Sequence, residues 1–153
     1  MEVIVVVVDC DWFTIDKVKY LKKIAFACSS LKYFREISFS LPPTAKRYAC
    51  QLNREALHSH GLVWSTKGDY GNDQIPQAFA DLFEQLGLRP AQIQFLAKGL
   101  EKCRLLQNWV PTVENLDDYC CPKYEALSTL DKTTLSKAIA FALWYDTWLH
   151  SFK

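Results

Sequence analysis

The sequence predicts an α/β domain built on a mixed five-stranded sheet, with three antiparallel strands followed by two parallel ones and with helices on both faces. The first observation behind this prediction is the run at residues 3–8, which is apolar and β-branched at every position. A strand without a polar side must be covered on both faces, as the strands of α/β sheets are. The second observation is the order of segments, because strand patterns come first and then alternate with helical ones. At 153 residues the chain fits a single domain, residues 1–153, with room for a core.

Two further strands are predicted shortly after the first. Residues 33–40 partly alternate between apolar and polar side chains and stop at Pro42 and Pro43, since proline cannot donate to a strand ladder. The link at residues 29–31 is short enough for a hairpin. This part of the chain is therefore expected to form an antiparallel meander, with strands at 3–8, 23–28 and 33–40 and a loop at 11–21.

The remaining chain alternates helices with short strands. Apolar residues recur at three- and four-residue steps from Ile75 to Leu86, which is typical of an amphipathic helix, and Gly87 ends it. A right-handed crossover places the fourth strand next to the first and brings the loop at Lys98 close to the end of that first strand. The predicted elements are helices at 45–57, 75–86, 99–108 and 134–148, strands at 93–97 and within 110–116, a loop and exposed turn at 58–73, and a largely irregular segment at 120–132.

Two acidic residues follow the first strand directly. Asp9 and Asp11 are two positions apart, so on an extended backbone their side chains point to the same side. In open α/β sheets this end of a strand is where ligands bind. Two carboxylates at the end of a buried strand form the beginning of a divalent-metal site, although acids at this position can also simply cap a turn.

Several segments resemble the DEDDh family of 3′–5′ exonucleases, which have the ribonuclease H-like fold, and more distantly the Maelstrom domain. Residues 7–11 are similar to the first exonuclease motif, usually Asp-x-Glu at the end of the first strand. Residues 60–64 fall where the family carries a Thr-Gly-Ile loop that lies against the terminal nucleotide. Residues 95–106 are similar to the second motif, typically His-Asn-x-x-Phe-Asp followed by a leucine four residues on. Residues 138–149 resemble the closing helix, so the resemblance covers nearly the whole chain and implies a ribonuclease H-like fold.

The chain departs from the family pattern at the later acids. Counting back four residues from Leu106 places Lys102 where the second motif has its aspartate. The closing helix of the family begins His-x-x-x-x-Asp, but residues 136–142 contain neither an acid nor a histidine. Asp131 and Asp146 lie at the wrong ends to substitute. The resemblance therefore implies a degenerate member, with two of the four acids present in type and no counterpart of the catalytic histidine.

Lysine at the position of the lost aspartate changes the expected chemistry. Two-metal hydrolysis of a phosphodiester needs a dense carboxylate cluster, and Mg²⁺ does not accept an ammonium ligand. A lysine within ~4 Å of an aspartate contributes roughly 1 to 4 kcal/mol of attraction, depending on the dielectric. We therefore expect Lys102, with Lys98 nearby, to neutralise Asp9 and Asp11 without a metal, leaving a degenerate catalytic site and no cofactor. Alternatively, both lysines are solvated residues at the start of a helix, although the helix dipole disfavours them there.

The predicted function is binding. The net charge of +1 gives no global attraction to nucleic acid, so any such surface must be a local patch. Single strands are held by aromatic stacking of bases and by cations on phosphates. Such a face would lie near the cleft of an exonuclease-like fold, and an ordinary charged surface is the alternative. The residues expected to bind nucleic acid are His60, Trp64, Lys98, Lys102 and Arg104. A wider basic and aromatic face adds Arg47, Tyr48, Arg54, Lys67 and Tyr70.

Two rival functions stay open. In the first, the chain is an active 3′–5′ exonuclease that depends on Mg²⁺ or Mn²⁺, with Asp9 and Asp11 as metal ligands beside a nonstandard third ligand. In the second, it is a homodimer or a protein-interaction domain without nucleic-acid binding. The helix at 134–148 is apolar enough to form that interface, although burial beneath the sheet of a monomer is slightly favoured.

Cysteine usage and the apolar runs indicate an intracellular protein, cytoplasmic or nuclear. The six cysteines form no CxxC pair, so free thiols are expected rather than a disulfide scaffold. A structural zinc site is not expected, because the spacing of the available ligands matches no zinc pattern. The apolar run at the start is shorter than the ~20 residues that cross a bilayer, so no membrane partner is expected. The zinc ligands considered are His58, His60, Cys120, Cys121 and His150.

Overall fold

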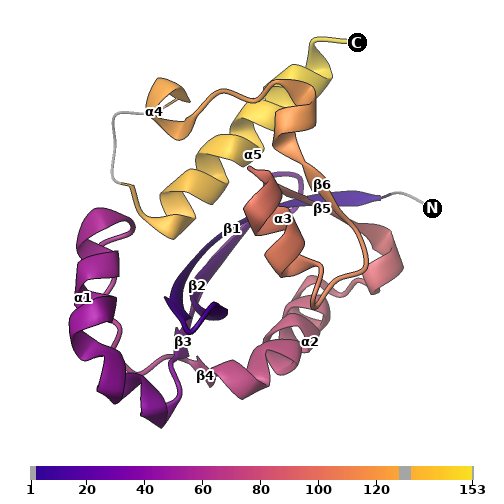
Figure 1. The fold of residues 1–153 in the computed structure, drawn as a ribbon. Coiled ribbons are helices and arrows are strands. Elements are labelled where there is room, and N and C mark those ends of the chain that lie inside the picture. Colours follow the sequence, from indigo (N-terminus) through magenta and orange to yellow (C-terminus); the bar gives the residue numbers. More distant parts are fainter. Residues whose placement is uncertain (1–2, 128–131, 153) are drawn as a thin grey trace.

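The computed structural model describes residues 3–127 and 132–152. Within these residues a mixed sheet of six strands, in the order β4-β3-β2-β1-β5-β6, forms the centre of the molecule (Figure 1). Strands β1, β2 and β3 are antiparallel neighbours, whereas β1, β5 and β6 run parallel to one another and β4 runs parallel to β3. The strands are β1 (Ile4–Ile15), β2 (Val18–Cys28), β3 (Tyr33–Ser40), β4 (Tyr70–Gly71), β5 (Ile93–Ala97) and β6 (Val113–Asn115).

The mixed α/β sheet is confirmed, but the predicted number of strands is wrong. As the crossover argument requires, the fourth predicted strand, β5, lies beside β1. The strand missing from the prediction is β4. It pairs with β3, and Tyr70 lies opposite Phe39. A strand of two residues is too short to produce a periodic pattern, so the sequence shows only the polar turn around it.

The segment predicted to be a loop at residues 11–21 is mostly strand. β1 continues through Ile15 and β2 begins at Val18, so Asp16 and Lys17 alone form the turn between them. Both turn residues have positive φ angles, 50° and 68°, as a type I′ turn in a two-residue hairpin requires. The sequence conceals this hairpin because Asp-Lys lacks the glycine that usually marks such a turn.

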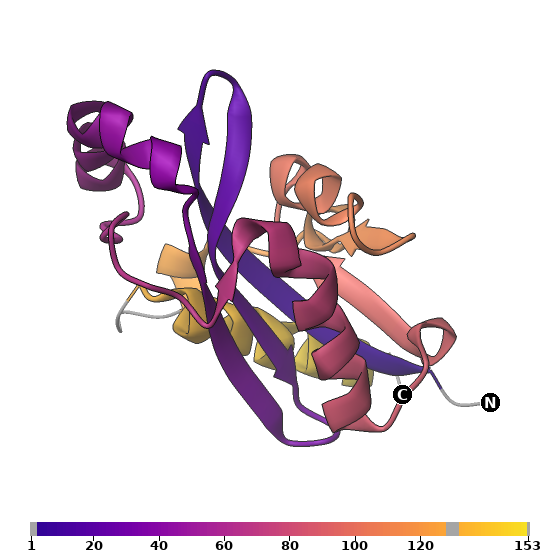
Figure 2. The same ribbon diagram turned by 90° about the horizontal axis from the view of Figure 1, so that it is seen from below.

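Helices cover both faces of the sheet. On one face Val6 and Val8 pack with α2 and α3, and on the other Val7 packs with α5. Figure 2 shows α2 in front of the strands and α5 behind them. The helix predicted at 45–57 is divided into a 3₁₀ helix (Pro43–Tyr48) and α1, and Gly87 ends α2 in the left-handed conformation as predicted. The helices are α1 (Ala49–His58), α2 (Ile75–Leu86), α3 (Leu100–Leu106), α4 (Tyr124–Leu127) and α5 (Thr134–His150).

The long C-terminal helix α5 is largely a core element. Its inward side chains Ala138, Phe141, Ala142 and Tyr145 are buried against β1, β2 and β5. Of the two roles considered for this helix, burial beneath the sheet and a partner surface, the structure shows burial for its inner side. In residues 3–127 and 132–152, no helix is long and apolar enough to cross a membrane.

A separate small core lies beyond the end of the sheet. The far part of the β1–β2 hairpin projects past the other strands, and α1 lies beside it (Figure 2). Phe13 and Ile15 from the hairpin pack on Leu52 and Ala56 from α1. We call this unit, residues 12–21 and 41–68, the hairpin lobe.

Candidate functional site

The two acids of β1 lie on the sheet face that α5 covers. Side chains alternate along a strand, so Asp9 and Asp11 share the face of Val7, which packs on α5. Asp9 is fully buried, and Asp11 is partly buried. Their neighbours on β2 are Ala25 and Lys23. The expectation that the acids follow the strand is wrong, because β1 continues through Ile15 and both acids lie within it, just past Val8, where its pairing with β5 ends. The middle of β1 therefore holds a buried carboxylate that needs a partner.

Both acids have protein partners. The ammonium of Lys102, in the first turn of α3, forms an ion pair and hydrogen bond with Asp9 Oδ1. At the start of α5, Thr134 donates its hydroxyl to Asp11 Oδ2 over 2.7 Å. Asp9 Oδ2 is buried and has no hydrogen-bond partner among the described residues. The middle of β1 and the first turns of α3 and α5 thus meet at one polar cluster, which we call the acid pocket: Asp9, Asp11, Lys102 and Thr134.

Burial and the mutual attraction of the two charges act against each other in this pair, and burial prevails only for the pKa of Asp9. It raises the pKa of the Asp9 carboxyl, against the opposing effect of the Lys102 ammonium, and the charge of Asp11 raises it further. For Lys102, burial alone would lower the pKa, but the Asp9 carboxylate and its hydrogen bond outweigh burial and raise it. Lys102 therefore stays protonated, and Asp9 holds its proton to a higher pH than an exposed aspartate does.

These directions predict how stability depends on pH. The folded pKa of Asp9 lies above its ordinary value of 3.8, so the folded state binds this proton more tightly than the unfolded chain. The resulting stabilisation is complete below about pH 4 and is lost as the pH rises through the folded pKa. Urea unfolding of the wild type and Asp9→Asn between about pH 4 and 7 measures this. The stability advantage of the wild type should shrink as the pH rises, and an advantage that grows with pH would contradict the burial argument.

Lys98 does not contribute to the acid pocket. Its ammonium binds the carboxylate of Asp117 and donates to the Cys121 carbonyl oxygen over 2.7 Å. The next residue, Gly99, donates its N–H to Asn115 Oδ1, so this turn is joined to the end of β6. The Lys98 backbone does follow the residue that pairs with Val8, as the crossover requires, but its ammonium does not neutralise Asp9 or Asp11, because the side chain is directed to the segment after β6.

The two loop residues predicted to bind nucleic acid, His60 and Trp64, form hydrogen bonds within the hairpin lobe. His60 Nδ1 accepts the Leu62 N–H over 3.1 Å, which leaves Nε2 to donate to the Trp12 carbonyl oxygen over 2.9 Å. Trp64 donates its indole N–H to Asn53 Oδ1 over 3.0 Å. These two residues and the two lysines thus lie in three different environments, and the fifth predicted residue, Arg104, is exposed on α3.

A small cavity connects the acid pocket to the hairpin lobe. It has a volume of about 290 Å³ and is lined by Asp11, Trp12, Glu55, Ser59 and His60. Both carboxylate oxygens of Glu55 accept the Thr14 N–H, at 3.0 and 3.1 Å. This role of Glu55 could not be predicted, because an acid in an amphipathic helix is usually a solvated residue.

The residues of the acid pocket fit a divalent metal poorly. Asp9 Oδ1 already faces an ammonium, and a dication bound at the buried Oδ2 would lie close to that positive charge. In the described ranges no three His, Cys, Asp or Glu side chains gather in a way that could hold a metal ion. Asp131 lies outside the described residues, and Asp146 forms an ion pair with His150 near the far end of α5. The candidate zinc ligands do not gather either.

No protein-family model matches the sequence, and no curated protein does. The resemblance to the exonucleases therefore depends on the order of the segments and on the motif residues. Two of those residues, Asp9 and Lys102, are in contact in the fold although they are far apart in the sequence. Thr134 was overlooked, since threonine at the start of a helix is normally read as a cap.

Proposed function

We propose that this chain is a catalytically degenerate, exonuclease-like domain of ribonuclease H-like fold that binds RNA or single-stranded DNA without cutting it. The proposal rests on the ion pair of Asp9 with Lys102, which places an ammonium where a metal-dependent exonuclease needs carboxylates. Apart from the short strand β4, the strand order β3-β2-β1-β5-β6 is the order that the resemblance implies, and the acids lie on β1 directly after the part that pairs with β5.

The chemistry of the acid pocket supports the non-catalytic part of this proposal. Hydrolysis by the two-metal mechanism requires cations that bind both the attacking and the leaving oxygen. Lys102 balances the charge of Asp9, and the Thr134 hydroxyl donates a hydrogen bond to Asp11. Both acids therefore interact with protein groups rather than with a metal. The pocket then stabilises the junction of β1, α3 and α5 and offers no metal-bound nucleophile.

A strand assay tests both parts. Labelled single-stranded RNA and DNA of about 16 nucleotides should bind, with an affinity that falls as salt rises, because phosphate contacts release counterions. The strands should keep their length in the presence of Mg²⁺ or Mn²⁺. Loss of terminal nucleotides by the wild type, abolished in Asp9→Ala and in the milder Asp11→Asn, would overturn the proposal and favour the active exonuclease.

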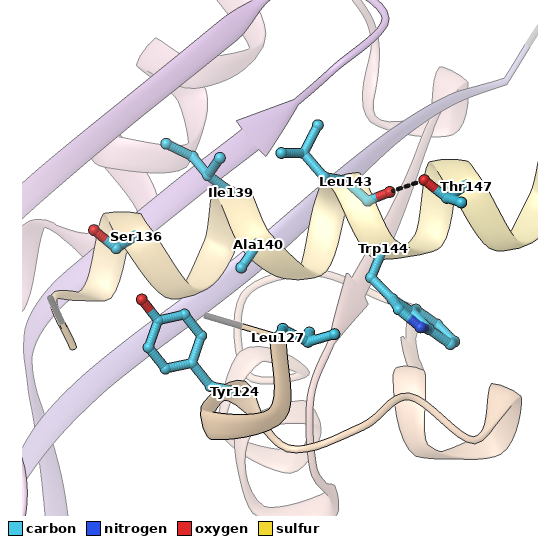
Figure 3. Close-up of a pocket in the computed structure, with 8 residues that line it drawn as sticks. All are labelled: Tyr124, Leu127, Ser136, Ile139, Ala140, Leu143, Trp144 and Thr147. Carbon is cyan, nitrogen blue, oxygen red and sulfur yellow. Dashed lines mark hydrogen bonds between the residues drawn. The ribbon is translucent and has the colours of Figure 1, made fainter. Parts of the chain in front are cut away.

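The outer side of α5 supports a second candidate, a homodimer without nucleic-acid binding. A cavity of about 510 Å³ opens between α4 and this side of the helix (Figure 3). Its lining is mainly apolar, and Leu143 is 53% exposed. Residues 128–131, which join α4 to α5, lie outside the described residues. Absence of strand binding at low salt, together with a dimer that Leu143→Glu dissociates, would favour this candidate.

A further inference from the structure

We infer that the hairpin lobe, rather than the acid pocket, is the surface that binds the phosphates of a single-stranded nucleic acid, an inference that rests on the proposed function. The near-neutral charge of the chain conceals an uneven distribution. The lobe carries six lysines and arginines against two acids, whereas the rest of the chain carries twelve against fifteen. A protein of net charge +1 thus has one unit of net charge +4, which is the local patch that polyanion binding requires.

Most cations of the lobe are available to a ligand. Lys19 forms an ion pair with Glu101 at 3.0 Å and lies over the Trp12 ring. The other five side chains are exposed and form no ion pair with any described residue. They are Lys17, Lys46, Arg47, Arg54 and Lys67. By contrast, the lysines of the acid pocket and of the β5–α3 turn are already bound to carboxylates.

The two acids of the lobe, Asp16 and Glu55, form no ion pair with these five cations among the described residues. Asp16 accepts a hydrogen bond from the Tyr48 hydroxyl over 2.9 Å, and Glu55 is bound to the Thr14 N–H. Both contacts join α1 and the preceding 3₁₀ helix to the hairpin. The acids therefore hold the lobe together, while the cations face solvent.

Aromatic side chains in the lobe favour a single strand over a duplex. Trp12, Tyr20, Tyr48 and Trp64 are each partly rather than fully buried. The hydrogen bond from Trp64 to Asn53 fixes that ring in place. Unpaired bases stack on such rings, whereas the bases of a duplex are already stacked on each other.

A pair of charge-matched variants tests the inference. The lobe variant is Lys46→Gln with Arg47→Gln and Arg54→Gln, and the matched control is Lys32→Gln with Arg89→Gln and Lys123→Gln. All six side chains are exposed and none has an ion pair among the described residues, so both variants should unfold in urea as the wild type does. The probe is a labelled oligo-dT or oligo-rU strand of about 16 nucleotides, measured by fluorescence anisotropy.

We expect the lobe variant to lose affinity by about a hundredfold at about 50 mM salt and the control variant by less than about threefold. The slope of log K against log salt should become shallower by about 2 in the lobe variant, since each single-strand phosphate contact contributes about 0.7. The double variant Lys17→Gln with Lys67→Gln should reduce the slope by about 1.4 and independently tests two other cations of the lobe.

The outcomes separate this inference from the proposed function. If the wild type binds the strand and the two triple variants lose affinity for it equally, the lobe is not the binding surface and the proposed function stands. Equal affinity for a duplex of the same length overturns the assignment to single strands. If the wild type binds no strand at low salt, the proposed function itself fails. Strong loss in the lobe variant alone, with single strands preferred, supports the inference.

Discussion

Replacing Lys102 with methionine should lower the free energy of unfolding by about 3–5 kcal/mol, because it leaves the buried Asp9 carboxylate without its counter-charge. Asp9 has no exposed surface, and the ammonium of Lys102 is its ion-pair partner. Methionine keeps most of the length and apolar contact of the lysine stem, so the loss reports the charge rather than a cavity. Urea unfolding at neutral pH, with an unchanged slope against urea, measures the effect.

A double replacement supplies the control. Asp9→Val with Lys102→Met exchanges the whole pair for apolar side chains, and valine continues the β-branched run of β1. Since such exchanges are often neutral or stabilising, the double variant should unfold within about 2 kcal/mol of the wild type. The single and double variants then form a thermodynamic cycle for the pair. A methionine variant as stable as the wild type would show that the ion pair contributes little to the fold.

The general architecture could be predicted from the sequence because hydrophobic patterns and chain handedness determine it. The unbroken apolar run of β1 required cover on both faces, and helices lie on both. The right-handed crossover placed β5 beside β1. Features without a periodic pattern were not predictable, such as the two-residue strand β4 and the Asp16-Lys17 turn, whose backbone angles are unusual for these residues.

The acid pocket was predictable only where a backbone element controls the side chain. Lys102 lies within α3, and the position of that helix after β5 aims it at Asp9. Lys98 precedes a glycine with a φ angle of 101°, and no sequence rule specifies in which direction such a turn sends its neighbours. His60 and Trp64 were expected at a nucleotide, but the hairpin extension that gives them structural partners was itself not predicted.

The charge of the hairpin lobe is visible in the sequence when charges are counted per segment rather than over the whole chain. Residues 41–68 alone contain four lysines and arginines against Glu55. Arg47, Arg54 and Lys67 were included in the wider basic face, yet that face was placed at the cleft. The fold instead groups them with the hairpin turn, because α1 packs on Phe13 and Ile15.

Replacing Lys102 with aspartate should create a pocket that binds Mn²⁺. The side chain of aspartate is shorter than that of lysine, and a coordination bond of about 2.1 Å makes up much of the difference. A metal held by the new carboxylate would therefore lie near the position of the Lys102 ammonium, next to Asp9. Asp11 lies on the same face of β1 as Asp9. Three carboxylates in a buried site repel one another, so without metal the variant should be less stable than Lys102→Met.

Thermal unfolding with and without Mn²⁺ measures the gain. At about 100 times the dissociation constant, Mn²⁺ should stabilise the aspartate variant by about 2.7 kcal/mol, whereas the wild type and Lys102→Met should not respond. Adding Asp9→Asn to the aspartate variant should reduce the response, because it removes a charged ligand. If Mn²⁺ leaves the aspartate variant unchanged, the acid pocket lacks the geometry of a metal site. The ion pair would then be a structural contact of this fold, and the resemblance to the exonucleases would lose its strongest support.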